Sequence, residues 1–382
     1  MRVVAITGAA GYVGGRLLAR LAADPEVEEV VGLDLRPLPR PTPGMLQLGG
    51  GTPPPWGGSR ETRMARIEAN GTNRGELPPI RDIRAIRGIR DPQVSREDTR
   101  PAVEMHPPPP EKLTFYQMDI SDPGLGDLLR RHRVEGLIHA AFVLHATPRQ
   151  MARMERTNVA GTANVLRAAV EAGVKRLAIL SSTTVYGAWP DNPVPLTEAH
   201  PPRPNPDYPY GMHKGRVEEM CRALERDHPE VACAVLRPPG IVGPHSRGPL
   251  ADLWRGRRAI LIDGGHAPGQ FVHEEDVVDL ILLALRAEAR GIFNATPDDW
   301  LPWRDLWAGA GKRPLNFPWP VARPLFGLMW RLGLLGGVTH PAQVGLARFP
   351  FVASNEKARR ELGWRPRYSS LRALQTFTGG TG

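Results

Sequence analysis

The sequence predicts an α/β protein in which a doubly wound parallel sheet is joined to a smaller C-terminal substrate domain. Short apolar runs rich in β-branched residues alternate with segments that have the spacing of helices, and a glycine-rich turn follows the first run. Beyond residue 240 this alternation loosens, and seven of the nine tryptophans lie there. Alternating strands and helices form parallel sheets with right-handed crossovers, so a Rossmann-like sheet is expected in the first part.

Each element of this sheet follows from the local pattern. A short continuous apolar run predicts a buried strand, and apolar residues three and four apart predict a helix. The predicted strands are 3–6, 27–33, 113–118, 136–141, 176–181 and 231–236, and the predicted helices are 14–23, 123–132, 153–172 and 208–227.

Residues 40–112 interrupt this rhythm. The segment contains runs of proline and glycine and a unit of Ile-Arg that repeats every three residues from Ile80 to Arg90. A period of three fits neither a helix nor a strand, and such a segment buries too little apolar surface to offset its ordering entropy. We therefore expect a mostly disordered insertion between the second and third strands.

Composition excludes several classes of protein. The net charge is +9, but no stripe of interleaved basic and aromatic residues predicts a nucleic-acid groove. Two cysteines, Cys221 and Cys233, cannot form a disulfide framework or a zinc site of Cys-x-x-Cys spacing. A cytoplasmic location is therefore expected, with no metal and no nucleic-acid partner.

No apolar stretch is long enough for a membrane span. The nearest candidate, residues 321–338, is interrupted by Arg323, Pro324 and Arg331. We interpret it as one or two amphipathic helices, and contact with a membrane surface is the less favoured alternative.

The first motif is a glycine-rich turn between a strand and a helix, with glycines at Gly8, Gly11 and Gly14. Glycine permits a tight turn and lets backbone N–H groups approach a pyrophosphate at the N-terminus of the helix. Asp34 ends the second strand, where a carboxylate can bind a ribose 2′-hydroxyl and would repel a 2′-phosphate. The pattern favours NAD over NADP, although Arg36 nearby weakens that preference.

The second motif is a Tyr-x-x-x-Lys pair, Tyr210 and Lys214, on a predicted helix. Positions four apart share one face, and a neighbouring ammonium group is expected to lower the pKa of the phenol. Ser182 follows a predicted strand, and ligands of parallel sheets bind where strands end. The three residues together predict proton transfer to or from a substrate oxygen.

In this order, the motifs resemble those of the extended short-chain dehydrogenase/reductase superfamily, in its NAD-dependent epimerase/dehydratase group. The resemblance covers residues 1–40 and 113–375. It implies that Tyr210 is the general acid/base, that Lys214 holds the nicotinamide ribose, and that Ser182 orients the substrate oxygen. The cofactor contacts that it implies are Gly8, Gly11, Tyr12, Val13, Gly14, Asp34, Asp119, Ile120, His139, Ala140, Ala141, Asn158, Tyr210, Lys214 and Pro238.

The resemblance also implies how the chain is organised. It predicts an NAD-binding domain over residues 1–240, to which 271–295 return, and a mainly substrate-binding domain over 241–382. It further implies a homodimer through the helices at 153–172 and 208–227. His213 lies between Tyr210 and Lys214 but on another helical face, so we interpret it as a histidine of the helix surface.

Two positions depart from the pattern of nucleotide-sugar members. Gly240 stands where those members usually carry asparagine, and Gly269 where they often carry arginine. Two diphosphate contacts are therefore missing, unless Arg247, Arg255, Arg257 or Arg258 replaces them. Tryptophans of the second domain could line an apolar substrate pocket or pack in its core: Trp300, Trp303, Trp307 and Trp330.

The favoured function is an NAD-dependent oxidoreductase that interconverts a secondary alcohol and a ketone. The alternative is a nucleotide-sugar epimerase or dehydratase that returns the hydride to its substrate. A non-catalytic dinucleotide sensor is disfavoured because both Tyr210 and Lys214 are present. Binding of nucleic acid by the arginine-rich insertion is disfavoured because acidic residues nearly balance its charge.

Overall fold

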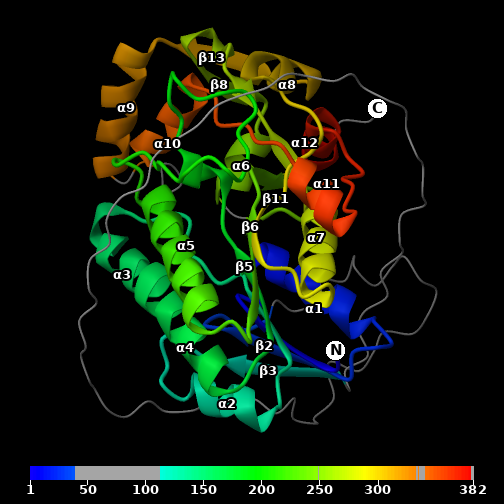
Figure 1. The fold of residues 1–382 in the computed structure, drawn as a ribbon. Helices are drawn as coiled ribbons and strands as arrows, with labels where there is room; N and C mark the ends of the chain where they lie inside the picture. Colours follow the sequence, from blue (N-terminus) through cyan, green and yellow to red (C-terminus); the bar gives the residue numbers. More distant parts are fainter. Residues whose placement is uncertain (39–111, 248, 333, 335–339, 380–382) are drawn as a thin grey trace, which may run out of the picture.

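The computed structural model describes residues 1–38, 112–247, 249–332, 334 and 340–379. The predicted disordered insertion at 40–112 lies outside the described residues except for its last position. Figure 1 shows a central sheet flanked by helices, with a second group of helices and short strands above one end of it.

The central sheet has seven strands, all parallel, in the order β11-β6-β5-β4-β1-β2-β3. It confirms the predicted doubly wound, Rossmann-like α/β fold. Its inner strands are apolar runs buried on both faces, as a parallel sheet covered by helices requires. The strands are β1 (Val3–Thr7), β2 (Glu29–Asp34), β3 (Leu113–Gln117), β4 (Gly136–His139), β5 (Arg176–Leu180), β6 (Ala232–Arg237) and β11 (Gly291–Asn294).

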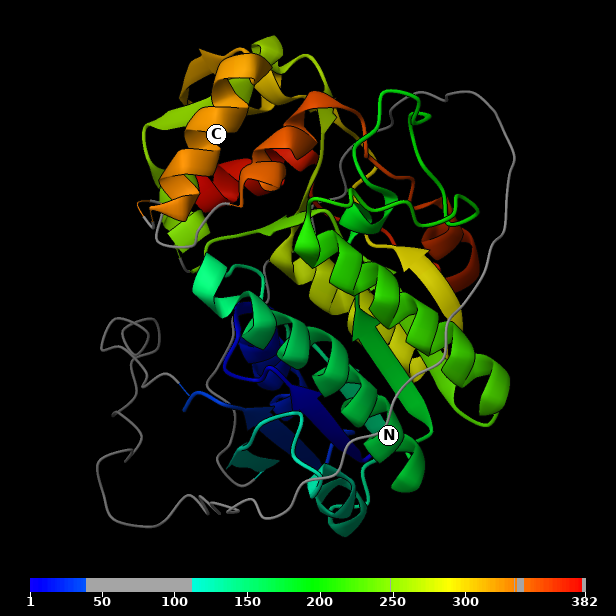
Figure 2. The same ribbon diagram turned by 90° about the vertical axis from the view of Figure 1, so that its left-hand side faces the viewer.

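Helices cover both faces of this sheet, and two separate apolar clusters fill the layers between. Helices α1 and α7 pack on one face, and α2, α4 and α5 pack on the other, where Figure 2 shows α4 and α5 running side by side. The helices are α1 (Tyr12–Ala22), α2 (Leu125–Arg131), α3 (Met151–Glu155), α4 (Thr162–Glu171), α5 (Pro209–Asp227) and α7 (Glu274–Arg286).

The predicted helix at 153–172 is divided. A π-helical turn at Arg156–Gly161 joins α3 to α4, and Asn158 lies within it. Short 3-10 helices lie at Pro148–Gln150, Thr183–Tyr186, Asp263–Gly265 and Leu346–Arg348.

The remaining elements form three two-stranded sheets, β10–β7, β12–β9 and β13–β8, with helices packed around them. The strands are β7 (Gly240–Val242), β8 (Arg258–Ile262), β9 (Pro268–Gly269), β10 (Phe271–His273), β12 (Leu301–Pro302) and β13 (Arg313–Phe317). The helices are α6 (Pro249–Arg255), α8 (Trp303–Gly309), α9 (Trp319–Arg331), α10 (Pro341–Gly345), α11 (Glu356–Leu362) and α12 (Ser370–Thr378). Among the described residues, no helix has the length and apolar character needed to cross a membrane.

A buried ion pair joins helix α5 to strand β6. Arg237 donates to both carboxylate oxygens of Glu218, over 2.8 and 2.5 Å, and both side chains are 0% exposed. The Ser181 hydroxyl, at the end of β5, donates to the same carboxylate over 2.6 Å. Glu218 lies one turn beyond Lys214, so this network holds the predicted catalytic helix against the carboxyl ends of two strands.

A second buried carboxylate, Glu274, joins the glycine-rich turn to the segment after β7. It accepts a hydrogen bond from the Tyr12 hydroxyl and also bonds the His245 ring. The first residue of α1 and the loop beyond Val242 are therefore connected through one side chain of α7.

Candidate active site

The glycine-rich turn connects β1 to α1 beside the end of β4. Gly8 has φ +76°, and a Cβ there would lie 2.6 Å from the backbone nitrogen of Ala141, while a Cβ at Gly14 would collide with the Gly8 carbonyl. Gly11 caps α1 without a side-chain hydrogen bond, so the first turn of the helix keeps its N–H groups for another acceptor. This cradle of bare backbone at a helix N-terminus fits a pyrophosphate.

Asp34 ends β2 beside this turn and is 8% exposed. Its carboxylate accepts hydrogen bonds from the backbone N–H of Ala10, over 3.0 Å, and of Arg36, over 2.9 Å. The Arg36 guanidinium lies 3.4 Å from the same carboxylate. Asp34, predicted to favour NAD over NADP, and Arg36 thus lie together at one edge of the cradle.

We predict that Asp34→Asn will shift the cofactor preference toward NADPH. The substitution removes the charge that repels a 2′-phosphate and leaves Arg36 in place to bind it. A hydrogen bond to a charged group contributes about 1.5–3 kcal/mol, so NADH affinity should fall about tenfold or more. Fluorescence titration with NADH and NADPH measures both affinities, and Arg36→Ala in the same background should reverse the gain. Tighter binding of NADPH than of NADH by the unaltered protein would contradict the assignment.

The predicted cofactor residue His139 is buried beside the glycine-rich turn. The buried His139 ring bonds the hydroxyls of Thr7, over 2.7 Å, and Thr162, over 2.9 Å. Thr162 donates its own proton to the Asn158 carbonyl, so it accepts from Nε2 of His139. Burial lowers the pKa of His139 to about 3, so the ring is neutral and ties β1 to β4.

Asn158 holds the segment that follows β4. Its amide bonds both the N–H and the carbonyl of Val143, over 2.8 and 2.9 Å, and its nitrogen lies 3.3 Å from the His213 ring. His213 is 7% exposed, so its interpretation as a surface histidine was wrong. The helical face that was expected to meet solvent instead meets the π-helical turn, which no local pattern indicated.

The other predicted contacts lie along the same edge. Asp119 accepts from the backbone and the hydroxyl of Ser121, Ile120 lies against Gly161, and the Pro238 carbonyl accepts from Thr183. Ala140 and Ala141 face Gly8 closely, and Val13 is buried beneath the first turn of α1. Their contacts with a cofactor stay predictions.

The structure brings Ser182, Tyr210 and Lys214 together at the carboxyl ends of β5 and β6. Ser182 follows β5, and Tyr210 and Lys214 lie four residues apart in the first turns of α5. The Ser182 side chain lies close enough to the Tyr210 hydroxyl to lower its pKa, so one substrate oxygen could reach both groups.

The pKa of Tyr210 is raised, contrary to the prediction that Lys214 lowers it. Burial raises this pKa to about 12, although the hydrogen bond from Ser182 opposes the increase. Burial also lowers the pKa of Lys214 to about 7, which reduces its positive charge near neutral pH. Its ammonium donates to the Leu180 carbonyl, over 2.5 Å, and lies 5.7 Å from the centroid of the Tyr210 ring.

Phe142 is a site residue that the sequence did not indicate. Its ring centroid lies 3.4 Å from Lys214 Nζ, and its ring meets that of Tyr210 edge-on at 5.5 Å. An aromatic ring over an ammonium group stabilises the cation. Phe142 follows the predicted His139-Ala140-Ala141 motif directly, so its position in the chain was the available signal.

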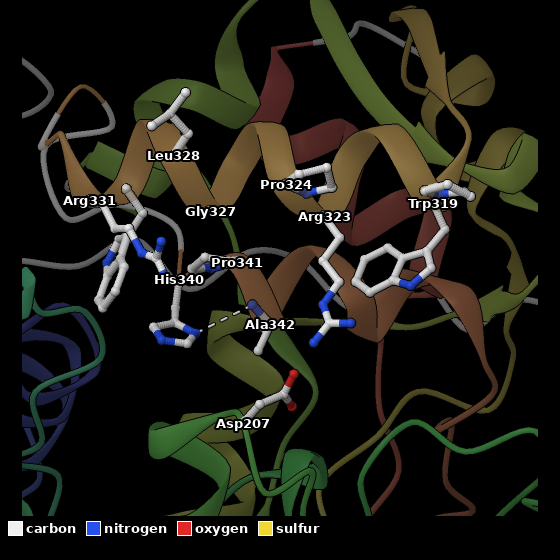
Figure 3. Close-up of a pocket in the computed structure, with 12 residues that line it drawn as sticks. Asp207, Trp319, Arg323, Pro324, Gly327, Leu328, Arg331, His340, Pro341 and Ala342 are labelled. Atoms are coloured by element: carbon white, nitrogen blue, oxygen red, sulfur yellow. Dashed lines mark hydrogen bonds between the residues drawn. The ribbon is translucent and has the colours of Figure 1, made fainter.

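A groove of about 760 Å³ lies between α9, α10 and Asp207, which precedes α5 by two residues. Figure 3 shows Arg323 reaching from α9 toward Asp207, with the Trp319 ring beside it and His340 at the other end. The His340 ring lies 6.5 Å from that of Tyr208, which lies 5.8 Å from Tyr210. The residues that line the groove are Asp207, Trp319, Pro320, Arg323, Pro324, Gly327, Leu328, Trp330, Arg331, His340, Pro341 and Ala342.

Comparison with known proteins assigns the family. The model of the NAD dependent epimerase/dehydratase family matches residues 85–295, more than half of the chain. This chain belongs to that family. The match confirms the resemblance expected from the glycine turn and the Tyr-x-x-x-Lys pair.

Relatives of this chain include an uncharacterized protein and a reductase. An uncharacterized protein of Mycobacterium tuberculosis strain H37Rv is 26% identical over 389 residues, 100% of this chain and 84% of the relative. The 3-diazoavenalumate denitrifying reductase of a Streptomyces species is 30% identical over 256 residues, 63% of this chain and 78% of the relative. These similarities do not assign a substrate.

Solved structures show the same fold. A dTDP-glucose 4,6-dehydratase of Streptomyces venezuelae, with NAD and TYD bound, superposes with a TM-score of 0.63 at 19% identity. The superposition covers 99% of this chain and 96% of that one. Proteins of this family and fold thus bind NAD, and nucleotide-sugar enzymes are among the structural neighbours.

The two positions that depart from nucleotide-sugar members of the family are packed against aromatic rings. A Cβ at Gly269 would lie 2.6 Å from the Trp303 ring, and one at Gly240 would lie 2.9 Å from Phe271. Trp254 and Trp307 complete this cluster by edge-on contacts with Phe271. Two of the predicted pocket tryptophans, Trp303 and Trp307, therefore pack in a core, while Trp330 lines the groove.

Proposed function

We propose that the protein is an NAD-dependent oxidoreductase that interconverts a secondary alcohol and a ketone. The observation that carries the proposal is the grouping of Ser182, Tyr210 and Lys214 beside the glycine cradle, where the Phe142 ring contacts both Tyr210 and Lys214. The similarity to a Streptomyces reductase supports net redox chemistry.

Each residue has a distinct role in this reaction. The glycine cradle and Asp34 would hold NAD, which would supply hydride transfer to and from the alcohol carbon. Tyr210 takes the hydroxyl proton on oxidation and donates it to the ketone oxygen on reduction. Its raised pKa keeps the phenol protonated at neutral pH, which favours the donating role. Ser182 orients the same oxygen, and Lys214 binds the ribose.

We propose that the groove between α9 and α10 holds the body of the substrate. Its walls include tryptophan, proline and leucine side chains, and its charged residues are Arg323, Arg331 and Asp207, so cations outnumber anions, which suits an apolar body bearing an anionic group. The aromatic packing at Gly240 and Gly269 supports this choice over a nucleotide diphosphate, because neither position can carry a longer side chain. In this proposal, residues 241–270 and 296–382 form the substrate-binding part.

The location and assembly of the chain are also proposals. We propose a cytoplasmic homodimer in which α4 and α5 pair with their counterparts. Arg216 of α5 forms an ion pair with Glu155 of α3, over 2.6 Å, and these charges lie on the surface that such a dimer would cover.

The test is the absorbance of reduced nicotinamide when the protein is mixed with NAD and pooled substrates. One pool contains apolar secondary alcohols with a carboxylate or phosphate, and a second contains nucleotide sugars. NADH should accumulate with the first pool only. Epimerised or dehydrated sugars without net NADH would replace the proposal with the nucleotide-sugar alternative.

A further inference from the structure

Helix α9 exposes a continuous stripe of large apolar side chains. Val321, Leu325, Leu328 and Leu332 are 54%, 39%, 57% and 63% exposed. Their spacing of four, three and four residues places them on one face of the helix. Ala322 and Phe326, on the inner face, are buried against β8 and β13, so the helix is anchored with this apolar face outward.

The segment around this stripe carries only positive charge. Residues 306–355 contain five cations, Lys312, Arg313, Arg323, Arg331 and Arg348, and no aspartate or glutamate, although Arg348 pairs with Asp263 from outside the segment. Arg331 is exposed and lies in the last turn of α9 beside Leu328 and Leu332. Large exposed apolar patches indicate interaction sites. The charged residues of the segment around this patch are all positive.

The positive charge around the stripe indicates which kind of partner binds it. A second copy docked by two-fold symmetry would place this acid-free segment against itself, and like charges facing each other oppose association. An anionic surface avoids that repulsion. An amphipathic helix with apolar residues on one side and cations at its border is the arrangement that lies on anionic bilayers.

We propose that the outer face of α9, formed by Val321, Leu325, Leu328, Leu332 and Arg331, docks on the surface of an anionic lipid bilayer. The apolar side chains enter the boundary between headgroups and acyl chains, and Arg331 contacts lipid phosphates. The inference does not depend on the proposed reaction. Leu328 and Arg331 belong to both this face and the groove, so a bound bilayer lies along one rim of the groove, where Arg323 is the cation left to the substrate.

The experiment is co-sedimentation of the full chain with two kinds of vesicle. One kind is phosphatidylcholine alone, and the other contains phosphatidylglycerol as well. The protein should sediment with the anionic vesicles, and added salt should weaken this binding because the headgroup attraction is screened. Val321→Asp with Leu332→Asp should lower the partition coefficient about tenfold or more, since charges replace two inserted side chains.

Matched variants separate docking from general effects. Val194→Asp places the same change at a side chain that is 46% exposed elsewhere. Arg331→Glu should also weaken binding to the anionic vesicles, and Arg131→Glu, at another exposed arginine, is its control. Both controls should sediment as the unaltered protein does. Leu325→Gln is a milder variant in case the double substitution unfolds, which circular dichroism would report.

Three outcomes would overturn the proposal. The first is the absence of sedimentation with anionic vesicles. The second is unchanged partition in Leu325→Gln and in the folded double variant. The third is a dimer, seen by analytical ultracentrifugation, that the α9 substitutions dissociate, because the stripe would then be a subunit interface.

Discussion

Tyr210→Phe should lower the turnover number by about a thousandfold, within the range that a general acid/base contributes. The variant keeps the ring that meets Phe142 edge-on at 5.5 Å, so packing at the site is retained. It removes the phenol oxygen, whose pKa the neighbouring Ser182 lowers and which would exchange the proton with substrate in our proposal. Steady-state kinetics give the turnover number, and fluorescence titration should show unchanged affinity for NADH.

Tyr208→Phe is the matched control for this prediction. Tyr208 is also buried, and its ring lies 5.8 Å from that of Tyr210, but its position before α5 gives it no contact with Ser182 among those described. Its turnover should stay within a few-fold of the unaltered protein. Full activity in Tyr210→Phe would remove Tyr210 from the mechanism.

Arg237→Met should lower the free energy of unfolding by about 3–5 kcal/mol, because it leaves a buried carboxylate without its cation. Glu218 is fully buried and receives two hydrogen bonds from Arg237. Two contacts remain, a hydrogen bond from Ser181 and the partly exposed Arg222 at 3.4 Å, and neither replaces a buried cation at 2.5 Å. Urea unfolding followed by circular dichroism measures the difference.

Arg222→Met isolates the contribution of burial. Arg222 pairs with the same Glu218 carboxylate at 3.4 Å, but its side chain is 42% exposed. Exposed pairs contribute about 0–1 kcal/mol, so this variant should unfold almost as the unaltered protein does. Equal losses in the two variants would contradict the view that Arg237 alone neutralises Glu218.

The sequence predicted the sheet well because its signals are local. The glycine turn at residues 7–14 and the apolar runs of β1 to β6 each show their structure within a few residues. Tyr210 and Lys214 could be paired from helical spacing alone. Boundaries moved by one or two residues, and a π-helical turn replaced part of one helix.

The missed features depend on contacts between distant segments. His213 is buried because the turn containing Asn158 covers it, 55 residues away in the chain. The pKa of Tyr210 was misjudged because it is raised by burial of the phenol, which helical spacing does not show. The groove arises from α9, α10 and Asp207, which no short motif connects.

The position of Glu274 has a thermodynamic consequence for ligand binding. This carboxylate bonds Tyr12, at the start of the helix that receives the pyrophosphate in our proposal, and His245, in the loop beyond β7. A ligand that changes one of these contacts changes the free energy of the other, and such coupling is reciprocal. Any ligand that changes the His245 contact therefore changes the affinity for the dinucleotide, and the dinucleotide changes the affinity for that ligand by the same factor.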